Sequence, residues 1–245
     1  MIMDSKQIIR TPQFINWFGD WTTGDNCSKV VDENGLPLVV YHGSEAVFDE
    51  FKSEYMGQTG TALGQGFYFS SHEEDAGAFG NNVKAFFLNI RKPLSADKLT
   101  MTSKDISRLL DTIDKVQCEN DPEFGYGVLS DFGDVDYEGR NNVLRSAVQM
   151  LMGENNDVEL IGGLINAVGD YDLVVNVLRQ TLGYDGIICK ERDVYVIHHA
   201  NQAKRITNSQ FNADSNNMNE SRRKIYLNES QFQLLTQYLK ENKKG

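Results

Sequence analysis

The residues of this sequence that are best suited to chemistry are a histidine, a tyrosine and a phenylalanine in a fixed order. His42 ends the apolar run "VVYH" just before Gly43 and Ser44, Tyr68 lies in "GQGFYFSS", and Phe79 follows Tyr68 after eleven residues. A neutral imidazole donates one hydrogen bond and accepts another, and the face of an aromatic ring attracts a cation. Taken singly, each of these side chains is better explained as part of a hydrophobic core. Only their arrangement with the rest of the chain can decide between the two interpretations.

Several common kinds of site are absent from the sequence. The four histidines and three cysteines show neither the HExxH spacing nor the CxxC spacing of zinc sites, so we expect no metal ion. The sequence also lacks the GxxxxGKS/T pattern of phosphate-binding loops and the GxSxG pattern of serine hydrolases. The odd number of widely spaced cysteines indicates free thiols in a reducing compartment.

The composition is that of an acidic globular protein. The 245 residues are 40% hydrophobic and carry a net charge of −11, which suits one large domain with appendages or two small domains. The negative charge argues against nucleic acid as a partner, because general binding to its backbone requires a basic surface. The N-terminus lacks a signal peptide, and no apolar stretch approaches the roughly 18 residues that span a membrane. We therefore expect a cytoplasmic protein without a membrane partner.

Short strands and helices must position the candidate residues. Asn34-Gly35 predicts a tight hairpin turn that leads into the strand of His42. Aromatic residues at helical spacing after Pro12 predict a short amphipathic helix that packs on the main domain. Ser71 can cap a helix that begins with three acidic residues. Further strands are predicted within 64–71, at 83–90, and in "YDGIIC", "VYVIHH" and "RITNSQF".

The middle of the chain, from about residue 100 to 182, has the pattern of helices. An apolar stripe runs from Ile106 to Val116, and "NNVLRSAVQMLM" and "YDLVVNVLRQTLG" show the same periodicity. The acidic run at 119–138 is explained either as a solvated loop or as a docking surface for a basic partner. Strands on both sides of a helical insertion indicate an α+β domain with a mostly antiparallel sheet, which we assign to residues 1–211.

The C-terminal part differs from this domain in composition. Residues 212–221, "NADSNNMNES", predict a polar linker. Residues 222–245 carry six basic and two acidic side chains, and Phe232, Leu235 and Leu239 form one apolar stripe. We expect this segment to be a separate, basic C-terminal helix.

The order of these motifs resembles the ADP-ribosyltransferase superfamily of the diphtheria-toxin and PARP type. There a histidine opens the signature on the first strand, a "GxGxYF" motif carries a tyrosine on the second, and an aromatic residue follows eleven positions later. The sequence is most similar to the ADP-ribosyltransferase domains in polyvalent proteins of phages and conjugative elements, which share "FxxWFGDW", "VYHG", "GxGFYF", "GYDGII" and a closing "NQxK". The resemblance covers about residues 12–211. It implies two packed, mostly antiparallel sheets with a helical insertion and a C-terminal helix.

The resemblance also implies a role in binding NAD for each candidate residue. His42 hydrogen-bonds a hydroxyl of the adenosine ribose, the backbone of Gly43 holds the nicotinamide carboxamide, and Ser44 adds a hydroxyl contact. Tyr68 and Phe79 pack on the two faces of the cationic nicotinamide, each contributing roughly 0.5–2 kcal/mol. Cleavage of NAD passes through an oxocarbenium-like state, so the site must stabilise developing positive charge. NAD is thus the expected substrate, and His42 and Tyr68 belong to the catalytic set.

The sequence departs from the family at the third signature residue, normally a glutamate seven or eight positions before the closing glutamine. Gln202 is that glutamine, so the expected positions hold Val194 and Tyr195, and neither is acidic. Asp193 lies one step earlier and would face the other side of a regular strand unless a bulge turned it inward. Three interpretations remain open. Asp193 replaces the glutamate as a catalytic residue, an acid from another segment replaces it, or the site binds NAD and reacts slowly or not at all.

Four residues near the last motifs have less direct roles. We expect Asp185 to be structural, at the entry to a strand, and Gln202 to fix a loop. His198 and His199 flank the site, and at most one of them should face it because adjacent residues of a strand point to opposite sides.

Two functions from different classes follow from this sequence. The first is a mono-ADP-ribosyltransferase that modifies a host macromolecule, most simply a protein, as a phage or mobile-element effector in bacterial cytoplasm. The second is a catalytically degenerate domain that binds NAD or recruits a partner. In either case we expect a monomer or a weak oligomer.

Overall fold

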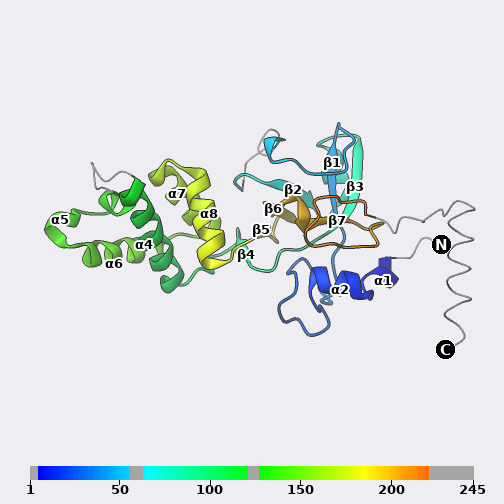
Figure 1. Cartoon of the computed structure of the whole chain (residues 1–245), viewed down its shortest axis with the longest axis horizontal. Coiled ribbons are helices and arrows are strands. Elements are labelled where there is room, and N and C mark those ends of the chain that lie inside the picture. The colour runs from blue at the N-terminus through cyan, green and yellow to red at the C-terminus, as the bar shows by residue number, and fades with distance from the viewer. Residues whose placement is uncertain (1–4, 56–62, 121–126, 221–245) are drawn as a thin grey trace, which may run out of the picture.

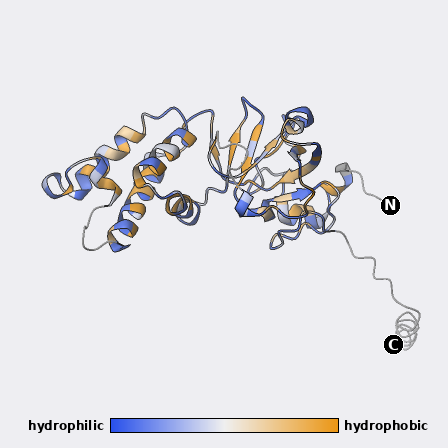
Figure 2. Ribbon diagram, turned by 90° about the horizontal axis from the view of Figure 1, so that it is seen from above, coloured by the Kyte–Doolittle hydropathy of each residue, from blue (hydrophilic) through white to orange (hydrophobic). Residues whose placement is uncertain are grey.

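The computed structural model describes residues 5–55, 63–120 and 127–220, which form two lobes (Figure 1). The sheet lobe contains the described strands together with the helices α1 (Ser5–Ile8), α2 (Pro12–Phe18) and α3 (Glu73–Gly77). The helical lobe consists of the helices between β4 (Pro93–Ser95) and β5 (Gly186–Cys189). Figure 2 shows hydrophobic residues concentrated on the strands and on one side of the longer helices, so each lobe has a core of its own.

Seven strands form one curled sheet in the order β4-β5-β6-β2-β1-β3-β7. Strands β4 and β5 run parallel, and the other neighbouring strands pair antiparallel. The prediction of an α+β protein with a mostly antiparallel sheet is therefore confirmed. The bounds of the remaining strands are β1 (Val40–Ser44), β2 (Phe67–Ser70), β3 (Asn82–Leu88), β6 (Val194–Ile197) and β7 (Ala203–Arg205).

The two packed sheets that we expected are not found among the described strands, although the single sheet nearly divides between β1 and β2. The register joins these two strands at one pair, Tyr41 with Ser70, whereas β1 pairs with β3 over its whole length. Beyond Tyr41, residues 42–44 of β1 therefore separate from β2. We call this place the β1–β2 junction. It lies between one half of the sheet, β4-β5-β6-β2, and the other, β1-β3-β7.

The helical lobe packs around the apolar stripe that the sequence predicts. Ile106, Leu109, Leu110 and Ile113 of α4 are fully buried. The helix α7 was not predicted, because its interior carries Gly162 and lacks a clear polar face. The elements of the lobe are α4 (Ser103–Asn120), the short turns η2 (Val128–Asp131) and α5 (Val135–Glu138), α6 (Arg140–Leu151), α7 (Asp157–Val168), α8 (Tyr171–Val177) and the π-helical turn η3 (Leu178–Leu182).

A buried carboxylate connects the helical lobe to the sheet. Asp157, the first residue of α7, is fully buried and accepts hydrogen bonds from the backbone amides of Ser95, Thr100 and Met101 at 2.7–2.9 Å. The Thr100 hydroxyl donates a further bond at 2.5 Å. Because a buried carboxylate without donors is strongly destabilising, these bonds hold the start of α7 against the strand β4.

The predicted amphipathic helix near the N-terminus is confirmed as α2. The Thr11 side chain accepts a hydrogen bond from the Phe14 amide, and Pro12 begins the helix. The ring of Phe14 lies 5.0 Å from the rings of both Phe87 and Phe211, measured between ring centroids. The helix thus covers β3 and the segment after β7 through one aromatic cluster. The predicted hairpin turn is also present, because Gly35 has a φ of 77° and the backbone bridges Val31 with Pro37.

The described part of the predicted linker packs firmly on the sheet lobe. Met218 is fully buried, and its backbone amide donates to the carbonyl of Asp49 at 3.0 Å. The fully buried Lys204 ammonium of β7 donates to the carbonyls of Ser215 at 2.7 Å and Asn217 at 3.0 Å. Residues 212–220 are therefore packed on the sheet lobe rather than a free connection, because their backbone carbonyls satisfy a buried lysine.

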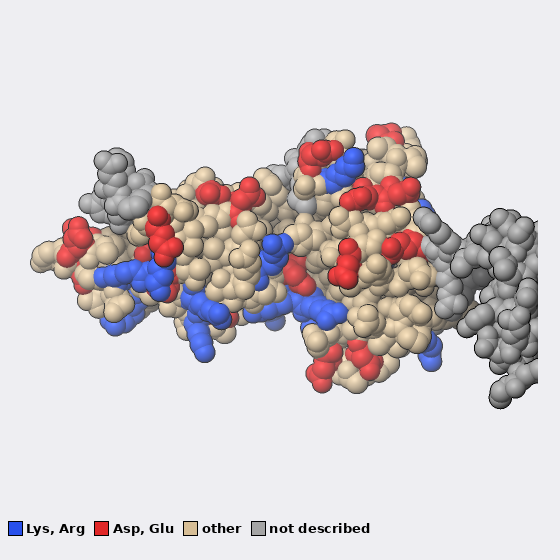
Figure 3. Space-filling model, viewed as in Figure 1, with Lys and Arg blue, Asp and Glu red and all other residues tan. Residues whose placement is uncertain are grey.

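Two regions of unusual charge extend beyond the described residues. The acidic run includes Leu129, which is fully buried in the helical lobe, so it is more than a solvated loop; residues 121–126 lie outside the described residues. The predicted C-terminal helix, 222–245, lies outside them as well. Figure 3 shows basic side chains gathered along one side of the helical lobe, whereas acidic side chains are frequent on the sheet lobe.

Packing of the segment before residue 221 predicts where the chain can be shortened. A protein ending at Asp214 loses the buried Met218 and the carbonyl partners of Lys204, so its free energy of unfolding should fall by about 2–5 kcal/mol relative to a protein ending at Glu220. Urea unfolding of the two truncated proteins measures the difference. Equal stability would contradict the packing described here, and a protein ending at Glu220 that is much less stable than the whole chain would show that residues 221–245 belong to the core.

Candidate active site

His42 lies at the β1–β2 junction and spans it with its side chain. Its Nδ1 is 2.8 Å from the carbonyl oxygen of Tyr68, and its ring packs against Phe48, Phe51 and Phe69. Burial lowers the pKa of His42, although the hydrogen bond to the Tyr68 carbonyl acts in the opposite direction. The imidazole is therefore neutral at pH 7. Because a carbonyl only accepts, Nδ1 carries the proton and Nε2 is left as an acceptor.

Gly43 is required by the close approach of the chain that follows α3. A Cβ atom at this position would lie 1.8 Å from the backbone oxygen of Ala76 and 3.3 Å from that of Gly80. Gly80 itself has a φ of 149° and packs against the backbone of Ser44. The Ser44 hydroxyl accepts a hydrogen bond from the Ala46 amide at 3.1 Å. The end of β1 and the end of α3 thus form one tightly packed backbone unit.

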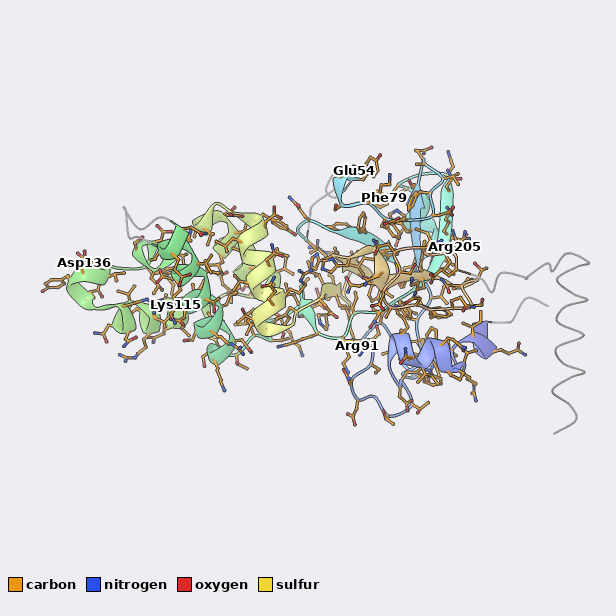
Figure 4. The ribbon with its side chains drawn as sticks, in the orientation of Figure 1. Glu54, Phe79, Arg91, Lys115, Asp136 and Arg205 are labelled. Carbon is orange, nitrogen blue, oxygen red and sulfur yellow. The ribbon has the colours of Figure 1, made fainter. Side chains whose placement is uncertain are left out.

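The two candidate aromatic residues have different surroundings. Tyr68 points away from Phe67 and Phe69, toward the core of the helical lobe, so its ring and that of His42 lie on opposite faces of the sheet. The Tyr68 hydroxyl donates to the Gly64 carbonyl at 2.5 Å, and burial raises its pKa. Phe79, just beyond α3, is 59% exposed and lies outside the core (Figure 4). Core packing thus largely accounts for the position of the Tyr68 side chain, but it does not account for the exposed position of Phe79.

Asp193 departs from a regular strand, as its proposed role requires. Its φ is 53°, in the left-handed region, where it forms the turn before β6. One carboxylate oxygen lies 3.3 Å from Nε2 of His72, and the Asp193 carbonyl accepts from the Ser71 amide at 3.1 Å. Asp193 therefore sits beside the beginning of α3, whereas Gly43 contacts the end of that helix.

Asp75 is a second acid in this region, and the sequence analysis did not identify it. Val194, where the family has glutamate, pairs with Ser70 of β2. The Ser70 hydroxyl donates to the carboxylate of Asp75 at 3.2 Å, so an acid from α3 lies next to the strand position that lacks one. The acidic first turn of α3 was a visible signal, but we interpreted it only as a favourable interaction with the helix dipole.

Two cavities lie between the lobes rather than at the β1–β2 junction. Their volumes are about 390 Å³ and about 500 Å³, and both are lined by Ser53, Arg179, His198 and His199. None of the candidate residues from β1, β2 and α3 lines either cavity. Both histidines line these cavities, because β6 ends at Ile197 and strand alternation no longer applies to them. The expectation that at most one of them faces the candidate site of His42 stays a prediction.

The closing motif fixes the loop that carries these histidines. The side-chain oxygen of Gln202 accepts from the backbone amides of His198 at 3.2 Å and His199 at 3.0 Å, and its amide group donates to the carbonyl of Asp185 at 2.7 Å. The Asp185 carboxylate accepts from the amides of Arg91 and Lys92 at 2.9 Å. The predictions that Gln202 fixes a loop and that Asp185 is structural are both confirmed.

Comparison with known proteins identifies one family. A family model described as ADP-ribosyltransferase in polyvalent proteins matches residues 32–213. No curated protein matches the chain. A crystal structure described as an anti-CRISPR protein matches 67% of this chain and 90% of its own chain, with 13% sequence identity. The TM-score is 0.27, which is too low to indicate a shared fold.

Two further observations concern only the described residues. None of their helices is long and apolar enough to cross a membrane. Nor do their histidine, cysteine, aspartate and glutamate side chains form a group of three or more that could hold a metal ion.

The burial of His198 predicts a pH dependence of stability. Burial, followed by the neighbouring His199, lowers the pKa of His198 to about 4, from 6.5. As the pH falls, the unfolded chain takes up this proton first, so the contribution to stability is complete above pH 6.5 and is lost between 6.5 and about 4. The loss should be about 2–3 kcal/mol.

Urea unfolding at pH 7 and pH 4.5 tests this expectation in the wild type and in His198→Gln. The carboxylates titrate in both proteins, so the difference between them isolates the histidine. The variant should lose less stability on acidification, and an equal loss would show that His198 does not resist protonation in the folded state.

Proposed function

This chain belongs to the ADP-ribosyltransferases of polyvalent proteins, a family that uses NAD, and on that premise we propose that it transfers a single ADP-ribose unit from NAD to a host protein. We further propose that it acts as an effector of a phage or mobile element in bacterial cytoplasm. The observation that carries this proposal is the geometry around Gly43. A backbone edge freed from β2, a neutral histidine and an exposed aromatic ring occur together where the family binds nicotinamide.

The binding of NAD follows from these three features. Because β1 pairs with β2 at Tyr41 and not beyond it, the backbone of Gly43 on that side can hold the nicotinamide carboxamide. The exposed ring of Phe79 supplies one face against the nicotinamide, with Tyr68 the proposed second contact. The unprotonated Nε2 of His42 accepts from a ribose hydroxyl. Ser44 adds a polar contact at the end of β1.

The reaction requires charge stabilisation rather than a metal or an activated water. The bond between the nicotinamide nitrogen and C1 of the ribose breaks, and nicotinamide leaves as a neutral molecule with the bonding electron pair. A nucleophile of the acceptor protein then bonds to C1 and gives up its proton. A carboxylate near C1 stabilises the oxocarbenium-like state between the two steps.

We propose Asp193 as that carboxylate, with Asp75 as its rival from another segment. The positive φ of Asp193 supports this role, because it removes the alternation that would point the side chain away. Its contact with His72 opposes the role slightly, because it directs the carboxylate toward α3. Asp75 has the advantage of lying beside Ser70, the partner of Val194.

The alternative function is a degenerate domain that binds NAD without turning it over. The feature that favours it is the apolar side chain at Val194, which packs at the edge of the helical core in place of an acid. Losing one preorganised electrostatic group typically costs about 10²–10³ in rate, so this alternative predicts very slow release of nicotinamide.

Binding of NAD should depend on Nε2 of His42. His42→Asn retains an amide donor in reach of the Tyr68 carbonyl and has no ring nitrogen at the position of Nε2. It should weaken the binding of NAD about tenfold or more, with a smaller fall in melting temperature than in His42→Ala. His42→Ala should weaken NAD at least as much and should also destabilise the protein, since it removes contacts with three phenylalanines. Isothermal calorimetry measures the affinity. If both variants bind NAD with wild-type affinity, His42 does not contribute to NAD binding.

Release of nicotinamide distinguishes the candidate acids. If Asp193 acts, Asp193→Asn should lower the rate by about 10²–10³ with NAD binding near normal, whereas Glu191→Gln and Asp75→Asn should have little effect. A large effect of Asp75→Asn alone would assign the acid to α3. In the degenerate alternative all three substitutions are silent, and Val194→Glu creates or raises activity. Mass spectrometry of a bacterial lysate incubated with NAD shows whether a protein acquires ADP-ribose.

A further inference from the structure

The two cavities between the lobes are chambers of one site. They are lined in common by Ser53 of the turn η1 (Ser53–Tyr55), by Arg179 of the π-helical turn η3, and by the adjacent His198 and His199 after β6. Three segments far apart in the sequence therefore converge here. A π-helical turn is rare and occurs frequently at functional sites, and this one carries the single arginine of the shared lining.

Arg179 has more donors than its protein neighbours use. A guanidinium carries five N–H groups. Among the described residues, its recorded hydrogen bond joins one terminal nitrogen to Nε2 of His199. No carboxylate of the described residues forms an ion pair with it. Its remaining nitrogens are not among the sealed, unsatisfied side-chain atoms of the described chain. They are therefore accessible from the cavities that Arg179 lines.

The charges around the shared lining favour an anion. His199 accepts the hydrogen bond from Arg179, so its Nε2 is unprotonated, and burial followed by the nearby guanidinium lowers its pKa. Asp172 lines only the first cavity. Glu50 lines only the second, and its carboxylate already accepts from the Asn216 side chain at 2.9 Å. No acid thus lies in the shared part, where an unpaired guanidinium meets a serine hydroxyl and two neutral imidazoles.

The shape and the walls favour a nucleotide over a bare anion. Chambers of about 390 and 500 Å³ have the size of sites for small organic ligands. A guanidinium binds phosphate oxygens in a planar, bidentate manner. Aromatic residues line both chambers and can contact a base or a ribose: Tyr171 and Tyr184 in the first, and Phe51 and Phe67 in the second.

The site is within reach of the candidate active site. Gln65 lines the first chamber and precedes Tyr68 by three residues, which span at most about 10 Å of extended chain. Phe51 lines the second chamber, and its ring centroid lies 5.0 Å from that of His42. One dinucleotide could therefore contact Gly43 with one end and Arg179 with its phosphates.

We propose that Ser53, Arg179, His198 and His199 form a binding site for the diphosphate group of a nucleotide. If the proposed function holds, on which this part of the inference rests, the nucleotide is NAD. The helical insertion then supplies, through Arg179, the cation of the shared lining, while Lys52 of the sheet lobe lines the second chamber only. The insertion is thus part of the substrate site rather than an appendage.

Calorimetric titration with ADP, NAD and nicotinamide tests the inference in the wild type, Arg179→Gln, Arg179→Lys and the control Arg108→Gln. Arg108 is an exposed arginine of α4 in the same lobe. We expect Arg179→Gln to lower the affinity for ADP and for NAD about 10- to 100-fold, because the substitution removes a charged hydrogen-bond donor. Arg179→Lys should fall between it and the wild type, since lysine keeps the charge without the planar fork. Nicotinamide should bind all four proteins alike, and melting temperatures verify that they are folded.

The outcomes separate this inference from the proposed function. If the wild type binds NAD and folded Arg179→Gln binds ADP and NAD equally well, the diphosphate site is wrong and the proposed function stands. If ADP binds and depends on Arg179 but NAD neither binds nor competes, the diphosphate site stands and its link to NAD is overturned. A wild type that binds neither ADP nor NAD overturns both. An equal loss of ADP affinity in Arg108→Gln would show that the effect comes from the change in net charge, and it would overturn the assignment to Arg179.

Discussion

The hydrogen bond from His42 to the carbonyl of Tyr68 holds together a sheet that is otherwise joined by one backbone pair. Where β1 separates from β2, a carbonyl of β2 would be left without a strand partner, and a buried unpaired carbonyl is costly. The imidazole fills that place at 2.8 Å and is itself enclosed by three phenylalanines. This one contact fixes the tautomer of His42 and keeps its second nitrogen available. It also lets the backbone of Gly43 turn away from β2. The histidine is thus both a satisfied core residue and a candidate ligand contact, and the two explanations do not exclude each other.

A few buried polar groups then set the relation between the lobes. Asp157 binds three amides near β4, and Gln202 connects the loop after β6 to Asp185. Both side chains bond mainly to backbone groups and thereby hold the two chain crossings between the lobes in place. The space between these fixed points is left open as two cavities. Besides apolar and aromatic side chains, Arg179 and the neutral histidines line it, and they keep polar groups exposed that folding alone does not need. Such groups are costly to retain unless a ligand uses them.

The sequence was most informative where a pattern has one physical cause. The capped helix after Thr11, the stripe of α4 and the loop-fixing glutamine follow from local chemistry and are found as expected. The divided but continuous sheet could not be predicted, because strand pairing between β1 and β2 depends on long-range register that no local signal specifies. Residues 212–220 looked like a linker because their backbone carbonyls, which no sequence pattern displays, hold the buried Lys204, while Met218 enters the apolar core. The pairing of Ser70 with Val194, which brings Asp75 next to that position, and the contact of Arg179 with His199 likewise join segments whose spacing in the sequence carries no information.

The exposure of both candidate acids constrains how such a site could work. Asp193 and Asp75 lie at the surface, both near the beginning of the short helix α3, and water screens a carboxylate there far more than a glutamate held inside a cleft. An exposed acid stabilises an oxocarbenium ion well only after something excludes that water. In the proposed site, nicotinamide stacked on Phe79 would cover one side, and an acceptor protein docked over α3 would cover the rest. With the apolar Val194 in place of an acid, the proposed charge would lie at the rim of the site rather than in its interior. A transferase built in this way would be slow toward water and faster toward a bound target, which makes the loss of the usual glutamate compatible with selective transfer.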